Sequence, residues 1–389
     1  MGTTSKGNEM LQRLIFLFSS TVFATNDLYM IDVKATINPG TTSYLEHGLE
    51  TAKKNNAQAL IIKLNTPGGM LNTTRDLVST ISESPIPIIV YVGPQGASAT
   101  SAGSFILIGS HLAIMNKGTN VGAASPVSGD GQKMDQTMES KVMNDTKAFM
   151  RSVAIDRGRN EIEAENFVEH ATSITAEEAL KKNVIDLIVE SESDLLSTIH
   201  SKEIKFHKEQ FTFNTLNSKI VFVEPRMLDT LLTYIAHPQI SYMLMSLGSI
   251  GLIYELTHPG VLIPGVAGAI CLLLALIAFQ TLPVSAGFMS LLGLGIIMMV
   301  AEIFLPSFGA LGIGGFIAFV LGSLYLFDDP SVQVPLRFIM TISLSVGGLL
   351  GFLGYLVASS RKKIKADTYS LIGLEGYSMD DFSHDGFVF

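Results

Sequence analysis

The fold is decided by two glycine-rich turns, Asn65-Thr66-Pro67-Gly68-Gly69 and Gly96-Ala97-Ser98-Ala99-Thr100-Ser101-Ala102-Gly103. The first turn follows the apolar run Ala59-Leu60-Ile61-Ile62-Lys63-Leu64, and the second follows Ile86-Pro87-Ile88-Ile89-Val90-Tyr91-Val92. Short runs of this kind predict buried strands. Each turn leads into a segment with helical character, so both are expected at one edge of a parallel sheet. Ligand and catalytic sites of open α/β sheets lie at this carboxyl edge.

The same alternation of strand and helix extends over residues 26–200, which are predicted to form one soluble α/β domain. The predicted strands are 28–33, 58–64, 86–92 and 184–189, and the predicted helices are 42–55, 73–83, 134–157 and one from about Ser101. Thr175-Ala176-Glu177-Glu178 has the spacing of a capping box at the start of a further helix. Residues 201–238 are predicted to be a polar connector with some strand character near 220–223.

The rest of the chain is predicted to be a membrane domain. Of the 389 residues, 47% are hydrophobic and only 16% are charged, and the mean hydropathy of +0.38 reflects an apolar excess after about residue 240. Each candidate span approaches the about 20 apolar residues that a bilayer core requires. The candidate spans are 240–256, 263–281, 285–304, 309–327 and 336–358.

Small and acidic residues inside these spans each have a structural and a functional interpretation. Gly312, Gly314 and Gly315 are expected to allow close helix packing. Glu255 and Glu302 fall near span ends, where interfacial placement is the favoured interpretation, although an acid inside a membrane also indicates a functional site.

The orientation follows from the charged residues at the two ends. Residues 1–24 combine basic residues with the apolar run Leu14–Ala24, which predicts a signal peptide cut near Ala24; the alternative is an uncleaved anchor. Arg361-Lys362-Lys363-Ile364-Lys365 follows the fifth span and is expected to stay in the cytoplasm. Five crossings would then place residues 26–238 outside a cell membrane of the bacterial type.

The composition argues against several classes of function. A net charge of −9 gives no reason to expect nucleic-acid binding. The only cysteine, Cys271, lies in an apolar run, so no internal disulfide and no cysteine nucleophile in the soluble part are expected. The histidines are scattered and lack cysteine partners, so neither a metal site nor another cofactor is predicted.

Serine chemistry is the first candidate activity of the α/β domain. A serine at a helix start has backbone N–H groups beside it, which an attacking oxygen and a developing oxyanion require. Ser98 and Ser101 both qualify by position, and Gly68 and Gly69 would add donors from the neighbouring turn. The structural alternative is that these small residues serve packing alone.

A serine nucleophile also needs a base. His47, His111, His170 and several lysines are available. Lys141 falls at the border of the apolar stripe of the helix 134–157, where desolvation can lower a lysine pKa from about 10.4; the alternative is that it reaches into solvent. Lys147 faces away from that stripe.

Taken together, these motifs resemble the NfeD family of membrane-bound serine proteases, whose soluble domain has a ClpP-like fold related to the crotonases. The resemblance rests on 65–69, 96–103, Ser110-His111, Lys141 and Arg157-Gly158-Arg159-Asn160, and also on the segment 175–180. It implies a membrane domain over 239–360 and a cytoplasmic tail, 361–389, that begins an incomplete OB-like domain.

The resemblance also assigns roles to particular residues. It implies Ser101 as the nucleophile, Lys141 as the general base, and the backbone of Gly69 and Ala102 as the oxyanion hole. Gly68, Met70, Leu71 and Ser125 would line an extended peptide bound as an added strand. The implied partners are proteins or peptides with apolar segments, a stomatin-like membrane protein, the lipid bilayer and a second copy of the chain in a homo-oligomer.

Two other functions stay open at this point. The chain could be a membrane scaffold that binds peptides or a stomatin-like partner without cutting them, and such a scaffold would tolerate loss of Lys141. Acyl-CoA chemistry on a crotonase-like relative of the fold is the other alternative. The predicted secretory signal argues against it, because CoA esters are cytoplasmic.

Overall fold

The computed structural model describes residues 27–127, 136–207, 209–258, 260–305, 307, 309–327 and 332–370. They form two compact units that meet in sequence at His237 and Pro238. The predicted signal peptide, 1–24, and the strand pattern after 370 lie outside the described residues. Residues 361–370 are the last residues of helix α14.

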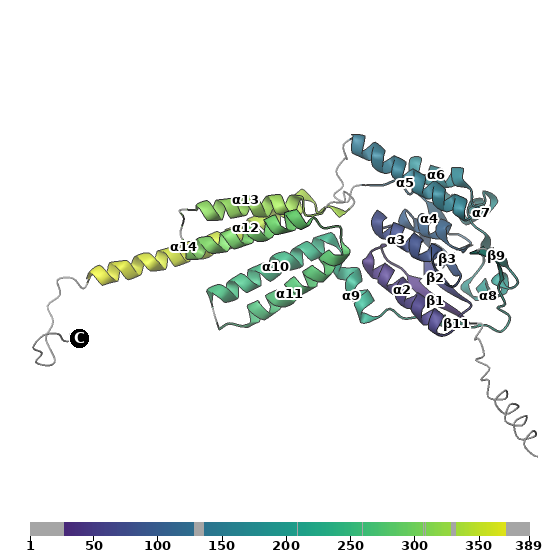
Figure 1. The fold of residues 1–389 in the computed structure, drawn as a ribbon, viewed down its shortest axis with the longest axis horizontal. Helices are drawn as coiled ribbons and strands as arrows, with labels where there is room; N and C mark the ends of the chain where they lie inside the picture. The colour runs from purple at the N-terminus through teal and green to yellow at the C-terminus, as the bar shows by residue number, and fades with distance from the viewer. Residues whose placement is uncertain are drawn as a thin grey trace, which may run out of the picture. The chain divides into compact units, whose positions relative to one another are not determined.

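A six-stranded sheet forms the centre of the first unit, in the order β11-β1-β2-β3-β5-β8 (Figure 1). All of its neighbouring strands are parallel. The strands are β1 (Leu28–Val33), β2 (Ala59–Leu64), β3 (Ile88–Val92), β5 (Leu112–Asn116), β8 (Leu187–Val189) and β11 (Ile220–Phe222). The expected α/β class, a parallel sheet followed by apolar helices, is confirmed.

Alternate residues of the strands enter two separate cores. On one face, residues such as Leu60 and Val90 pack against α2 (Pro39–Lys54), α3 (Leu71–Ser82), α4 (Ala102–Gly109) and α5 (Gln136–Asp156). On the other face, residues such as Ile61 and Ile89 pack against α8 (Leu195–Ile199) and the hairpin of β9 (Glu203–Phe206) and β10 (Glu209–Thr212). Strands buried on both faces explain why the sequence shows apolar runs rather than alternation.

A small second sheet stands beside the second glycine turn. It consists of β4 (Ser98–Thr100), β6 (Asn120–Gly122) and β7 (Ser173–Thr175). Helices α6 (Glu161–Glu169) and α7 (Ala176–Lys181) flank β7 in the chain. The predicted capping box at the start of α7 is present, because Thr175 and Glu178 bond each other's backbone N–H.

The segment expected as a polar connector contributes to the α/β unit. Its strand β11 pairs with β1 along the edge of the main sheet. Helix α9 (Met227–Ile235) is tied to α2, since the Asn38 side chain donates a hydrogen bond to the Thr233 carbonyl at 3.1 Å. The compact unit therefore continues to His237 and does not end near residue 200.

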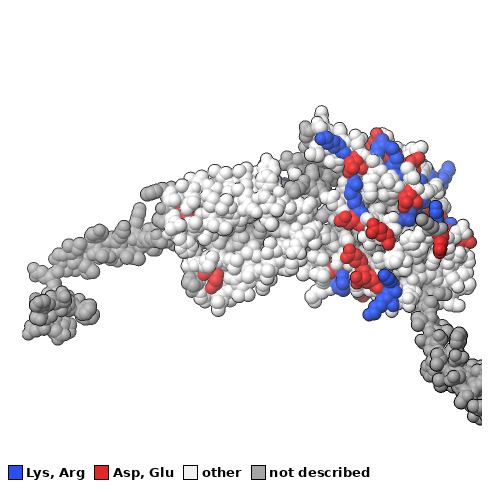
Figure 2. All heavy atoms as spheres, viewed as in Figure 1, with Lys and Arg blue, Asp and Glu red and all other residues white. Residues whose placement is uncertain are grey.

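The second unit consists of apolar helices, and Figure 2 shows that Lys, Arg, Asp and Glu gather on the first unit instead. Among the described residues, 3 helical segments are long and apolar enough to cross a membrane: Pro238–Thr257 (α10), Ile263–Thr281 (α11) and Leu336–Leu356, part of α14 (Leu336–Ser370). Helices α12 (Ala286–Phe304) and α13 (Ala310–Leu324) provide shorter apolar segments at the other two predicted spans. The number of crossings stays a prediction.

The helical hairpins α10–α11 and α12–α13 carry glycine and glutamate at equivalent positions, which are 47 residues apart in the sequence. Glycines bring the paired helices into backbone contact: a Cβ on Gly268 would lie 2.7 Å from the Gly248 carbonyl oxygen, and one on Gly315 equally close to that of Gly295. Glycine at such positions lets helices pack without intervening side chains, as predicted for membrane packing.

The two intramembrane acids hold equivalent places in these hairpins. Glu255 and Glu302 each lie in the last turn of the first helix. The Glu302 carboxylate accepts backbone N–H bonds from the start of α13, at 3.0 Å from Gly309 and 3.2 Å from Gly312. Glu302 therefore serves as an N-terminal cap for α13, which accounts for an acid at the end of an apolar helix.

Candidate active site

The first glycine turn is fixed from both sides at the carboxyl edge of the sheet. On one side, Ile37 donates its N–H to the Gly68 carbonyl at 2.8 Å and accepts from the Met70 N–H at 3.0 Å. On the other side, Thr66 bonds β4, donating to the Ser98 carbonyl at 2.8 Å and accepting from Thr100 at 3.1 Å. The turn is therefore a rigid link between the two glycine motifs.

This pairing leaves the N–H of Gly69 unused. The bonds of Ile37 go to the residues before and after Gly69, so the N–H and carbonyl of Gly69 point away from Ile37. Within the described part of the chain, the Gly69 N–H donates no hydrogen bond. A Cβ at this position would lie 2.1 Å from the Ile37 carbonyl oxygen, so only glycine fits.

Ser101 lies directly against this turn. A Cβ on Gly68 would be 2.7 Å from the Ser101 Cβ and 3.1 Å from its Oγ, and Gly68 has φ +130°. Ser101 itself has φ 53° and ψ −114°, a conformation that side chains rarely adopt. Strain of this kind concentrates at functional sites.

The Ser101 hydroxyl and the start of α4 are unengaged. The hydroxyl makes no capping bond, and no hydrogen bond to it is found in the described residues. Ala102 is the first residue of α4, so its N–H has no partner within the helix. Ser101, Gly69 and Ala102 thus bring together one free hydroxyl and two free N–H groups.

Ser98, the other candidate serine, is already engaged. It lies in β4 rather than at the helix start, and its hydroxyl donates to the Asn120 side chain at 2.7 Å. Its backbone N–H bonds the Asn65 side chain at 3.2 Å. The geometry therefore favours Ser101 over Ser98.

His111 does not supply a base beside Ser101. His111 is buried at the opposite, amino edge of the sheet, where its Nδ1 accepts the N–H of Ile88, the first residue of β3, at 3.2 Å. Burial, together with the charges of Arg157, His207 and Arg159, lowers the pKa of His111 to about 3. It is therefore neutral at working pH and on the wrong side of the sheet.

The two lysines of α5 are placed differently from each other. Lys147 forms ion pairs with Glu165 and Glu169 of α6, so it is committed to the contact between these helices. Lys141 is exposed, and the described residues offer it no hydrogen bond or ion pair. The structure does not bring Lys141 into contact with Ser101, and the solvent-facing interpretation of Lys141 holds in the single chain.

The expected peptide-binding residues lie around the first turn and beyond β6. Met70 precedes α3 and Leu71 begins it, and both are half-buried. Ser125 donates its hydroxyl to the Val168 carbonyl at the end of α6, so this hydroxyl is bound internally.

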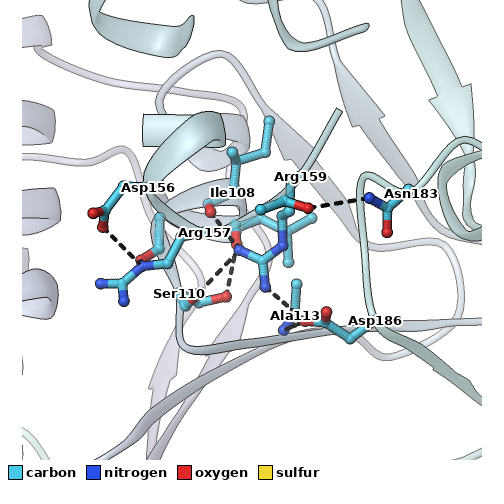
Figure 3. A network of polar contacts seen from close by, with 11 residues as sticks. Ile108, Ser110, Ala113, Asp156, Arg157, Arg159, Asn183 and Asp186 are labelled. Carbon is cyan, nitrogen blue, oxygen red and sulfur yellow. Dashed lines mark hydrogen bonds and ion pairs between the residues drawn. The ribbon is translucent and has the colours of Figure 1, made fainter. Parts of the chain in front are cut away.

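The sequence did not reveal what holds the far end of α4. Arg159 donates to the carbonyls of Leu107 at 3.3 Å and Ser110 at 2.9 Å, and also to that of Ile108 (Figure 3). Arg157 Nε donates to the Gly109 carbonyl at 2.9 Å. Both arginines belong to the motif 157–160. This motif contributed to the family resemblance, but the sequence alone did not indicate what the arginines bind.

Asp186 completes this network. Its carboxylate accepts from Arg159 Nη2 at 2.6 Å and from the Ala113 N–H at 2.7 Å (Figure 3). The last carbonyls of α4 and the start of β5 are thereby joined through buried charge. The helix that begins at Ser101 is anchored firmly at its other end.

Comparison with known proteins gives matches to both units. Residues 27–206 match the N-terminal domain of NfeD1b, and residues 239–356 match the NfeD integral membrane domain. A membrane-bound protease of Pyrococcus horikoshii is 32% identical over 388 residues, which cover 96% of this chain and 88% of that protein. The membrane protein NfeD1b of Bacillus subtilis is 31% identical over 304 residues, 75% of this chain and 65% of that protein.

A solved structure matches the α/β unit. It is a membrane-bound, stomatin-specific protease with one lysine replaced by alanine, in complex with a substrate peptide. It is 35% identical, covers 55% of this chain and 98% of its own, and superposes with a TM-score of 0.50.

The α/β unit carries an unengaged serine at a helix start and is followed in the chain by apolar helices. Together with the similarity to these relatives, this identifies the chain as a membrane-bound protease. The chain belongs to the NfeD family.

Proposed function

We propose that Ser101 is the nucleophile of this protease, that Lys141 is its general base, and that the N–H groups of Gly69 and Ala102 form the oxyanion hole. The observation that carries the proposal is the free Ser101 hydroxyl beside two free N–H groups on a turn that only glycine can form. Donors preorganised in this way stabilise the charge that develops on a carbonyl oxygen under attack.

The reaction would be acyl transfer to serine. Lys141 takes the proton of the Ser101 hydroxyl as Oγ attacks the peptide carbonyl, and it returns this proton to the leaving amine. Water then attacks the acyl-enzyme, its proton passing through Lys141 back to Ser101 Oγ. A peptide lying along Gly68, Met70 and Leu71 would pair with this edge as an added strand through the Gly69 carbonyl, while the Gly69 N–H stays available for the oxyanion.

The proposal requires Lys141 to approach Ser101 when substrate binds or when a second copy of the chain covers the site. The first turns of α5 support this requirement, because residues 136–141 are exposed and lack the packing that fixes the later turns at Met150 and Ala154. Catalytic contacts often form fully only in the complex with substrate.

The substrate class that we propose is an apolar segment of a membrane or secreted protein, and a stomatin-like protein is the proposed partner. The support is the solved relative, which is described as stomatin-specific and was captured with a substrate peptide. We further propose that the α/β unit lies outside the cell and that the C-terminus is cytoplasmic, since Arg361, Lys362, Lys363 and Lys365 follow the last apolar segment.

The test is labelling of the full-length protein, in detergent, with a serine-directed fluorophosphonate, followed by mass spectrometry. We expect an adduct on Ser101 that is lost in Ser101→Ala and Lys141→Ala. Lys147→Ala is the matched control on the same helix, and it should label normally because Lys147 only pairs with α6.

Each other outcome has a defined meaning. An adduct on Ser98 would show that the nucleophile was chosen wrongly, and undiminished labelling of Lys141→Ala would remove the proposed base. A folded protein that neither labels nor cleaves apolar peptides would instead be the non-catalytic scaffold.

A further inference from the structure

A hollow lies in the α/β unit, away from Ser101. It has a volume of about 580 Å³ and opens at the amino edge of the sheet, where the His111 N–H bonds the Ile88 carbonyl at 3.0 Å. Ser101, in contrast, follows the carboxyl end of β3. Because the two sites occupy opposite edges of one sheet, the hollow is separate from the candidate active site.

Basic side chains from separate parts of the chain converge on this hollow. They come from the start of β5, from the link between α5 and α6, and from β9 with its flanks. The basic residues in its lining are His111, Arg157, Arg159, Lys202, Lys205 and His207.

The carboxylates of the hollow pair with its two arginines and leave its two lysines without an ion pair among the described residues. Asp186 is already bound to Arg159 and to the Ala113 N–H. Asp156 approaches Arg157 only at 3.7 Å, and Glu203 is exposed. Lys202 and Lys205 form no ion pair within the described residues.

Arg157 leaves one donor group of the hollow unused. Its Nε holds the Gly109 carbonyl, but its Nη2 is buried and has no acceptor among the described residues. A buried donor without an acceptor costs free energy, which an anionic ligand would recover.

We propose that this hollow binds a small molecule that carries a phosphate group, with Arg157, Lys202 and Lys205 as its charged donors. Guanidinium and ammonium groups are the usual donors to phosphate oxygens in proteins. The volume lies within the range of about 300–1,000 Å³ that small-molecule sites occupy. The site is separate from the proposed Ser–Lys chemistry and does not depend on it.

The test is equilibrium dialysis of the full-length protein in neutral detergent against radiolabelled inorganic phosphate at constant ionic strength. We expect saturable binding that approaches one phosphate per chain. The double variant Lys202→Ala/Lys205→Ala should weaken binding at least about tenfold, which corresponds to the loss of one or two charge-assisted contacts.

The matched control is Lys53→Ala/Lys54→Ala, which removes the same charge from the exposed end of α2. It should bind phosphate as the unaltered protein does. Binding that does not saturate, or that falls equally in both double variants, would show general attraction to positive charge and overturn the proposal.

A second arm distinguishes the source of the phosphate. Nanodiscs with anionic lipid are compared with neutral nanodiscs in competition with labelled phosphate. Displacement by anionic lipid alone would assign the site to a lipid headgroup, whereas displacement only by added glycerol phosphate would assign it to a soluble ester. Failure of both to displace bound phosphate would overturn the assignment to phosphate-bearing molecules.

Discussion

The two ends of helix α4 are held in opposite ways. At its start, Ser101 is strained, its hydroxyl is free, and the Ala102 N–H has no partner. At its other end, Arg157 and Arg159 bind the carbonyls of the last turn. The backbone N–H at the start of the helix is therefore left available, whereas carbonyls of its last turn accept hydrogen bonds from arginine side chains.

This difference shows how a short helix can carry reactive groups without losing its position. Free N–H groups at a helix start stabilise a developing oxyanion only if they stay in place. An eight-residue helix has few internal hydrogen bonds to hold it. We infer that the arginines at the far end supply the rigidity that the reactive end lacks.

The largest expected effect comes from Ser101→Gly. Cleavage should fall by at least about a thousandfold, because the nucleophile is lost. The free energy of unfolding should rise by about 1 kcal/mol, since glycine adopts φ 53° and ψ −114° without the strain that serine bears there. Peptide cleavage and urea unfolding of the α/β unit measure the two effects.

Ser101→Ala separates the two parts of that prediction. It also lacks the hydroxyl, so cleavage should be lost equally, but alanine keeps the strain and should not gain stability. Equal stability of the glycine and alanine variants would show that the Ser101 backbone stores no strain.

Arg159→Met tests the opposite end of α4. Arg159 is buried, and its loss removes the side-chain donor to the Ile108 and Ser110 carbonyls and the cation that pairs with Asp186, so unfolding should become easier by about 3–5 kcal/mol. Arg151→Met is the control, because Arg151 is exposed on α5 and its one ion pair among the described residues is with Glu165. If both variants are equally stable in urea, the buried network does not anchor α4.

The free energy of unfolding should depend on pH through His111, at the amino edge of the sheet. The pKa of His111 is about 3 in the folded chain and about 6.5 when unfolded, so the unfolded chain binds the extra proton between these values. Stability is therefore complete above pH 6.5 and is lost as the pH falls toward 3. Between pH 7 and pH 5 the loss should be about 2 kcal/mol.

His111→Asn should remove this slope from the pH profile of unfolding, because asparagine can still accept the Ile88 N–H. His170→Asn should leave the slope intact, since His170 is exposed. A profile that stays the same in the His111 variant would assign the dependence to other groups.

The reactive end of α4 could be predicted from the sequence much better than the anchored end. A glycine turn after an apolar run is a local signature, and it marks the ends of β2 and β3. The strand β5 was not predicted, because Leu112–Asn116 continues the apolar character of α4, and periodicity does not separate a buried strand from a buried helix.

Contacts between distant segments account for the other omissions. The edge position of β11 and the bonds of Arg157 and Arg159 to α4 join residues far apart in the chain, and no local pattern indicates such pairs. The sequence left open whether Lys141 is desolvated at the border of the apolar stripe or reaches into solvent. Helical phase shows that a residue lies at such a border, but it does not determine how much of a long side chain is exposed.

Ser98→Ala gives the smallest effect and sharpens the choice of nucleophile. The substitution removes one partly buried hydrogen bond, to Asn120, so unfolding should become easier by about 1 kcal/mol. Cleavage should stay within about twofold of the unaltered protein, a change of less than 0.5 kcal/mol in the barrier. The stability effect is small because β4 keeps its backbone bonds to Thr66, and the activity is kept because the free hydroxyl belongs to Ser101. If Ser98→Ala loses as much cleavage as Ser101→Ala and still unfolds normally, the nucleophile is Ser98 in β4 and not Ser101.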